Sequence, residues 1–91
     1  MYLSDLEQAQ CMEFIKHLTK DMRIGQGHVC YGMDMDRVAI SFPDRGSESE
    51  KTANDVRDTL ESEYPNVVEE WLVEESQDRE SKFLVVEGWW K

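Results

Sequence analysis

The sequence predicts an α+β domain in the order helix, hairpin, helix, hairpin, with a four-stranded antiparallel sheet and both helices packed on one face. Three observations predict this fold. Apolar residues recur at helical spacing in residues 4–23, alternate with polar residues in 28–42, and concentrate near the C-terminus on both sides of a polar segment. Residues 1–91 have the length of a single domain, with room for one modest core but little for a deep enzyme cleft.

The first helix is expected over residues 4–23. Ser4 and Glu7 have the spacing of a capping box, in which each side chain bonds the backbone amide of the other residue. Gly25 is the expected stop. The apolar face of this helix would consist of Leu6, Cys11, Phe14, Ile15, Leu18 and Met22.

A first hairpin is expected from two alternating runs, residues 28–33 and 37–42, with Asp34-Met35-Asp36 as the turn between them. Residues 43–46, Pro-Asp-Arg-Gly, would end it as a loop. Alternation predicts one buried face, carrying Val29, Tyr31, Met33, Val38, Ile40 and Phe42.

The second helix is expected to begin near Ser47, where Ser47-Glu48-Ser49-Glu50 has the pattern of another capping box, and to end at Pro65. Its apolar stripe is narrow: Ala53, Val56, Leu60 and Tyr64. Acidic residues crowd the remaining surface, and like charges at helical spacing destabilise an isolated helix. We therefore expect this helix to depend on docking its stripe onto the sheet.

Residues 66–75 fit either a strand or a third helix. The strand is favoured because a polar turn at 76–81 and a run of β-forming residues at 82–87 follow, so that a second hairpin closes naturally. The chain then ends Gly88-Trp89-Trp90-Lys91, and in a strand only one of two adjacent Trp side chains faces the core.

The charge of the chain is concentrated in one third of its length. The net charge is −10, and residues 48–80 contain twelve acidic against three basic residues, a net −9. Such acidity opposes direct binding to nucleic acid or to an anionic membrane, and it favours attraction to a basic partner protein.

No motif for catalysis, a cofactor or a metal is present, so no enzyme activity is predicted. Cys11, His17, His28 and Cys30 lack the paired spacing of zinc sites, and Asp34 with Asp36 lacks the glycine and further ligands of a calcium loop. Two free thiols, no signal-peptide pattern and no apolar run of membrane-helix length predict a cytoplasmic protein.

Size and acidity together make the chain resemble the class of small phage or mobile-element proteins that inhibit host defence nucleases, including anti-restriction and anti-CRISPR proteins that mimic DNA. That resemblance implies an inhibitor whose carboxylates occupy the nucleic-acid groove of a nuclease or CRISPR complex at a charge density comparable to duplex DNA. An apolar anchor would come from Trp89 or Trp90. The carboxylates expected at the interface are Glu50, Asp55, Asp58, Glu61, Glu69 and Glu70.

Three other interpretations remain open at this point. The acidic residues could form a solvated surface without a partner, which is the usual fate of charge runs. The protein could be an immunity protein or antitoxin that neutralises a basic toxin nuclease. It could also be a structural subunit, such as a homodimer that pairs through a sheet edge.

Overall fold

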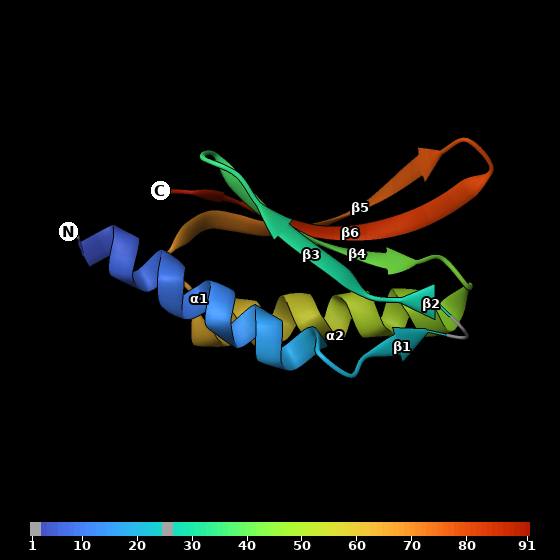
Figure 1. Cartoon of the computed structure of the whole chain (residues 1–91), viewed down its shortest axis with the longest axis horizontal. Helices are drawn as coiled ribbons and strands as arrows, with labels where there is room; N and C mark the ends of the chain where they lie inside the picture. The colour runs from blue at the N-terminus through green and yellow to red at the C-terminus, as the bar shows by residue number, and fades with distance from the viewer. Residues whose placement is uncertain (1–2, 25–26) are drawn as a thin grey trace.

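Figure 1 shows the fold in a computed structural model, which describes the backbone of residues 3–24 and 27–91 and the side chains of residues 5–24 and 27–91. The elements are α1 (Leu3–Thr19), β1 (Arg23–Ile24), β2 (Gly27–His28), β3 (Cys30–Met33), β4 (Arg37–Pro43), α2 (Ser47–Glu63), β5 (Val68–Asp78) and β6 (Ser81–Trp90).

The predicted α+β fold is confirmed. Strands β3 to β6 form a four-stranded antiparallel sheet in the order β3-β4-β6-β5, and both helices lie on the same side of it (Figure 1). Residues 68–78 form strand β5, so the strand interpretation of this segment was right and the helical one was wrong. The sheet has two edges, a short one at β3 and a long one at β5.

The core lies between the helices and one sheet face. Removing large apolar side chains from water stabilises a fold by roughly 1.5–3 kcal/mol each. The buried apolar residues are Cys11, Ile15, Ile24, Val29, Val38, Ile40, Phe42, Ala53, Val56, Leu60, Val67, Val68, Trp71, Leu84 and Val86. The opposite sheet face carries the alternate residues of β4 and β6, and neither of the two described helices covers it (Figure 1).

Helix α1 ends earlier than predicted, at Thr19 instead of residue 23. The buried Thr19 hydroxyl donates to the carbonyl of Ile15 at 2.8 Å, and the Met22 amide donates to the carbonyl of Thr19 at 3.1 Å. The chain then enters a two-stranded ribbon, β1 with β2, which buries Ile24 completely. The side chain of Ser4, the expected N-cap, lies outside the described side chains, and Gly25, the expected stop, lies outside the described residues.

The predicted capping box at Ser47 is wrong. The N-cap of α2 is Gly46, with φ of 87°, and no side chain caps this end. Instead, the side chain of Ser49 is fully buried. Its hydroxyl donates to the carbonyl of Pro43 at 2.6 Å and accepts from the Arg45 amide at 2.7 Å. Ser49 therefore ties the start of α2 to the loop before it. The helix ends at Glu63, before Pro65, as predicted.

The second hairpin turns more tightly than predicted. Its strands run to Asp78 and from Ser81, so Arg79 and Glu80 alone form the turn, where residues 76–81 had been expected. Two-residue hairpin turns require positive φ, and Arg79 has φ of 57°. The extra residues lengthen β5 to 11 residues.

The expected burial of β3 is also wrong in part. Tyr31 and Met33 are in register with the buried Ile40 and Val38, but their exposed fractions are 42% and 57%. Strand β3 is an edge strand, so no neighbouring strand covers its outer side. The first residue of this predicted face, Val29, is buried as expected.

Candidate functional site: the acidic side of α2 and β5

Helix α2 and strand β5 carry most of the charge of the molecule. Together the two elements contain eleven carboxylates and only two basic residues, Lys51 and Arg57, which gives a net charge of −9. Helix α2 packs beneath the half of the sheet that contains β5 and β6. We call α2 and β5 together the acidic side; its carboxylates are Glu48, Glu50, Asp55, Asp58, Glu61, Glu63, Glu69, Glu70, Glu74, Glu75 and Asp78.

The four predicted carboxylates of α2 are exposed: Glu50, Asp55, Asp58 and Glu61. The buried stripe of the helix consists of Ser49, Ala53, Val56 and Leu60. Asp58 lies two residues from both Val56 and Leu60, so at about 100° per residue it points directly away from the sheet. The structure therefore places Asp55, Asp58 and Glu61 toward the outer face of α2, whereas Glu50 lies at its side, next to β5.

Glu69 and Glu70, also predicted, are exposed in a β-bulge of β5. Val68 is in register with Trp90 and Trp71 with Gly88, so two residues of β5 oppose the single residue Trp89 on β6. A bulge bends and twists the strand that carries it. Here it lies on an edge strand and presents both carboxylates at the border of the sheet.

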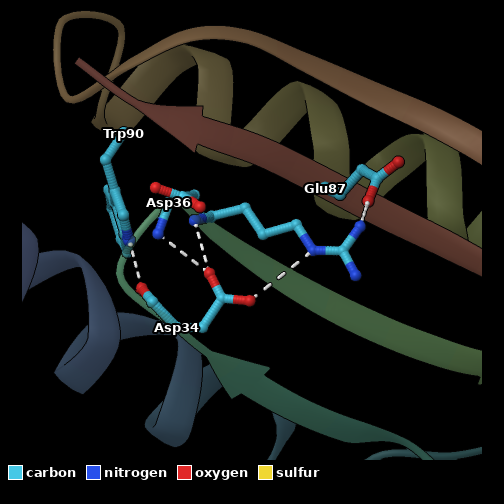
Figure 2. A network of polar contacts seen from close by, with 5 residues as sticks. Asp34, Asp36, Glu87 and Trp90 are labelled. Atoms are coloured by element: carbon cyan, nitrogen blue, oxygen red, sulfur yellow. Dashed lines mark hydrogen bonds and ion pairs between the residues drawn. The ribbon is translucent and has the colours of Figure 1, made fainter.

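The two C-terminal tryptophans have different environments, as expected for a strand. Trp89 is 39% exposed and in register with Arg37, on the sheet face away from the helices. Trp90 packs against the core, and its indole Nε1 donates to the Asp34 carbonyl at 3.2 Å (Figure 2). Trp89 is thus the available anchor, but it lies on the other side of the sheet from the outer face of α2.

A cleft of about 550 Å³ separates the first half of α2 from the distal part of β5 and β6. Its acidic lining residues are Asp44, Glu50, Glu74 and Glu75. Arg57 is the one basic residue in the lining, and its guanidinium bonds Asp58 at 2.9 and 3.2 Å. The sequence prediction omitted Glu74 and Glu75, although both belong to the same acidic run.

Most carboxylates of the acidic side form no ion pair in the described part of the chain. Among the residues that the structure describes, Asp58 alone of the eleven forms an ion pair, with Arg57. Isolated surface ion pairs contribute little stability, so the lack of further ion pairs on the acidic side costs the fold little. It leaves a strong uncompensated negative potential on one side of the molecule.

A second polar cluster lies at the other end of the sheet and has a structural role. The Arg37 guanidinium lies between two carboxylates labelled in Figure 2: its Nε atom is 3.9 Å from Asp34 Oδ2 and its Nη1 atom is 3.1 Å from Glu87 Oε2. Glu87 is only 5% exposed. Burial, followed by the neighbouring Glu74 carboxyl, raises the pKa of Glu87, while Arg37 lowers it. Sequence reasoning missed this residue.

The turn role predicted for Asp34 is confirmed. Its Oδ1 atom accepts from the amides of Asp36 and Arg37, each at 2.9 Å (Figure 2). These bonds favour the carboxylate form and lower the pKa of Asp34. One carboxylate oxygen of Asp34 is therefore committed to the hairpin turn.

The residues considered for a metal site are dispersed. Cys11 is buried in α1, where desolvation raises the pKa of its thiol to about 12, whereas Cys30 is exposed on β3. Within residues 3–24 and 27–91, no three His, Cys, Asp or Glu side chains come together in an arrangement that would hold a metal ion.

The comparisons with known proteins identify no relative: no family model, no curated protein and no solved structure matches the chain. Neither helix in the described part of the chain is long and apolar enough to cross a membrane.

Proposed function

We propose that the chain is an inhibitor that binds, through the acidic side, the basic nucleic-acid groove of a defence nuclease or CRISPR effector complex, in the cytoplasm of the host cell. The observation that supports this proposal is the uncompensated charge: a net −9 on two adjacent elements, whose eleven carboxylates form one ion pair with a described residue. If the acidic residues served only solubility, the same charge spread evenly over the surface would serve equally well.

The spacing of the charges suggests which nucleic acid is imitated. The 11 residues of β5 span roughly 36 Å at about 3.3 Å per residue. The eleven carboxylates of the acidic side then give about one charge per 3.3 Å, close to the roughly 3.4 Å of a single DNA strand and half the density of a duplex.

The energetics of such a complex would be dominated by electrostatics. Charge complementarity accelerates association, and the attraction between exposed charges weakens as salt shortens the Debye length. Capture from a bacterial lysate at low salt, followed by a salt gradient and mass spectrometry, would name the partner. We expect a nuclease or CRISPR subunit that elutes as salt rises.

A charge-reversal experiment then tests whether the acidic side makes the contact. The variant Asp55→Lys/Asp58→Lys/Glu61→Lys changes the outer face of α2, and Asp5→Lys/Glu13→Lys/Asp21→Lys makes the same charge change at exposed positions in and just after α1. We expect the first variant to lose binding and inhibition and the second to retain most of both. Circular dichroism would show that both variants stay folded.

Equal losses in the two variants would mean that net charge alone, and not the acidic side, attracts the partner. Retention of binding by the α2 variant would overturn the proposal. A captured partner that is indifferent to salt would do so as well.

A further inference from the structure

We propose that two copies of this chain pair through their β3 strands, antiparallel and centred on Gly32, to form one continuous sheet twice as wide. This inference does not depend on the proposed inhibitor function. It rests on the hydrogen-bonding direction of β3, on its exposed apolar side chains, and on where the charge of the molecule lies.

Among the residues that the structure describes, none bonds the backbone of β3 on its outer side. The Asp34 amide donates to the Arg37 carbonyl at 2.9 Å, so residue 34 bonds toward β4. Bonding direction alternates along an antiparallel strand, which turns Gly32 toward β4 and Tyr31 and Met33 outward. The outer edge of β3 therefore presents the amide and carbonyl groups of Tyr31 and Met33.

The two edges of the sheet differ in how they are protected. Edge strands avoid pairing with other chains by means of charge and bulges. Strand β5 has five carboxylates and a bulge, whereas Cys30–Met33 carries no charge and exposes Tyr31 and Met33. The β5 edge is therefore protected by charge and by a bulge, whereas the β3 edge has neither and is protected only by its short length of 4 residues.

One register makes the β3 edge self-complementary. With Gly32 opposite its own copy, each Tyr31 lies opposite Met33 of the other copy, and this pair exchanges both of its backbone hydrogen bonds. The same pairing brings the exposed ring of Tyr31 into contact with the exposed side chain of Met33 from the other copy, on one face of the sheet. A register centred on Tyr31 would instead place Met33 opposite Val29, which is already buried.

The charge distribution permits this pairing in spite of a net charge of −10 for each copy. Strand β3 is the edge farthest from β5. At roughly 4.8 Å between neighbouring strands, the two β5 strands of the dimer would lie about 34 Å apart. The Debye length at physiological salt is about 8 Å, so the two acidic sides would be screened from one another.

Disulfide trapping tests the register directly. Opposed residues of a non-hydrogen-bonded pair have Cα atoms about 4.5 Å apart, within the roughly 4.4–6.8 Å that a disulfide spans. A Cβ atom at Gly32 would meet nothing within 4 Å, so the substitution is tolerated. We expect the variant Gly32→Cys in a Cys30→Ser background to form a covalent dimer under mild oxidation, reversed by reductant.

The matched control is Met35→Cys in the same Cys30→Ser background. Met35 is 95% exposed, in the hairpin turn, and in the proposed register its two copies lie far apart. We expect it to cross-link much more slowly. Equal cross-linking of the two variants, or none at position 32, would overturn the proposed pairing.

Sedimentation velocity of the unmodified chain gives an independent test. The proposal predicts a shift from 10.7 kDa toward twice that mass as concentration rises from micromolar to millimolar. Met33→Lys should remain monomeric over this range, while Met35→Lys should associate like the unmodified chain. A monomer at all concentrations, or equal effects of the two substitutions, would contradict the proposal.

Discussion

The guanidinium of Arg37 on β4 lies 3.1 Å from the carboxylate of Glu87 on β6, on the sheet face opposite α1 and α2. Glu87 is nevertheless the one buried charged residue in the described part of the chain, and Arg37 is its one ion-pair partner there. A buried carboxylate with a single partner tends to be costly, because desolvation can exceed the attraction. The raised pKa of Glu87 has the same cause.

The first prediction is that Glu87→Gln stabilises the protein at neutral pH. Because the folded state raises the pKa of Glu87, its contribution to stability is complete below the unfolded pKa and is lost as pH rises through the folded pKa. Glutamine stays neutral at every pH. The melting temperature of the variant should therefore increasingly exceed that of the unmodified chain between pH 4 and pH 7.

Substitution of the neighbouring carboxylate, Glu74, tests whether the raised pKa of Glu87 causes this pH dependence. Glu74→Gln removes a group that raises the pKa of Glu87, so it should reduce the pH dependence without abolishing it. If Glu87→Gln proves less stable than the unmodified chain at pH 7, attraction to Arg37 outweighs desolvation at this position.

The second prediction concerns the turn between β3 and β4. Asp34→Ala removes the acceptor for the amides of Asp36 and Arg37 and should lower the melting temperature, whereas Asp34→Asn keeps an acceptor oxygen and should lower it less. Because the pKa of Asp34 is lowered, its stabilising contribution is present above the unfolded pKa and is lost as pH falls through the folded pKa.

Asp36→Ala is the control for this prediction, because no hydrogen bond of its side chain is found in the described part of the chain. Thermal denaturation at pH 7 and pH 3 should separate the three variants at the higher pH and bring Asp34→Ala closer to the unmodified chain at the lower one. An equal loss in Asp36→Ala would show that the turn depends on general polarity.

Local sequence patterns predicted the elements well, because helix and strand periodicity depend on neighbours in the chain. The apolar stripe of α2 and the β-forming run of β6 are examples of such patterns. The order of the strands, however, depends on which distant segments pair. The register of β6 against β4 likewise places Trp89 on the sheet face away from the helices, so that Trp89 and the outer face of α2 lie on different sides of the molecule.

The errors within elements have the same physical origin. The pKa of Glu87 depends, besides burial, on Arg37, which is 50 residues away, and on Glu74 on the neighbouring strand. The exposure of Tyr31 and Met33 follows from the edge position of β3, which alternation alone does not show. For the acidic side, sequence indicated the charge, whereas the structure determined which carboxylates share a face.

The third prediction distinguishes two serines at the start of α2. Ser49→Ala leaves the Arg45 amide and the Pro43 carbonyl without their partner, and unsatisfied buried polar groups cost roughly 1–3 kcal/mol. Ser47→Ala changes an exposed side chain that does not cap the helix, so its effect should stay within about 0.5 kcal/mol. Urea denaturation measures both, and a larger loss for Ser47→Ala would restore the capping box.

The fourth prediction concerns Gly88, which lies where β5 resumes its pairing after the bulge. A Cβ atom there would approach the two Cγ atoms of Val68 to 3.0 Å and the Cε3 atom of Trp71 to 3.1 Å. All three contacts belong to buried side chains, so Val68 and Trp71 would have to move within the core. Overpacking of this kind costs typically about 1–3 kcal/mol, which is the loss expected for Gly88→Ala in urea denaturation.

Gly32→Ala is the matched control, since both glycines lie in strands and a Cβ atom at Gly32 would meet nothing within 4 Å. Alanine also reduces the freedom of the unfolded chain, so in dilute solution this variant should match or slightly exceed the stability of the unmodified chain. The difference between the two variants isolates the close approach of β6 to the bulge. Equal stabilities would mean that Val68 and Trp71 yield without cost, and that the bulge carrying Glu69 and Glu70 is not held by packing at Gly88.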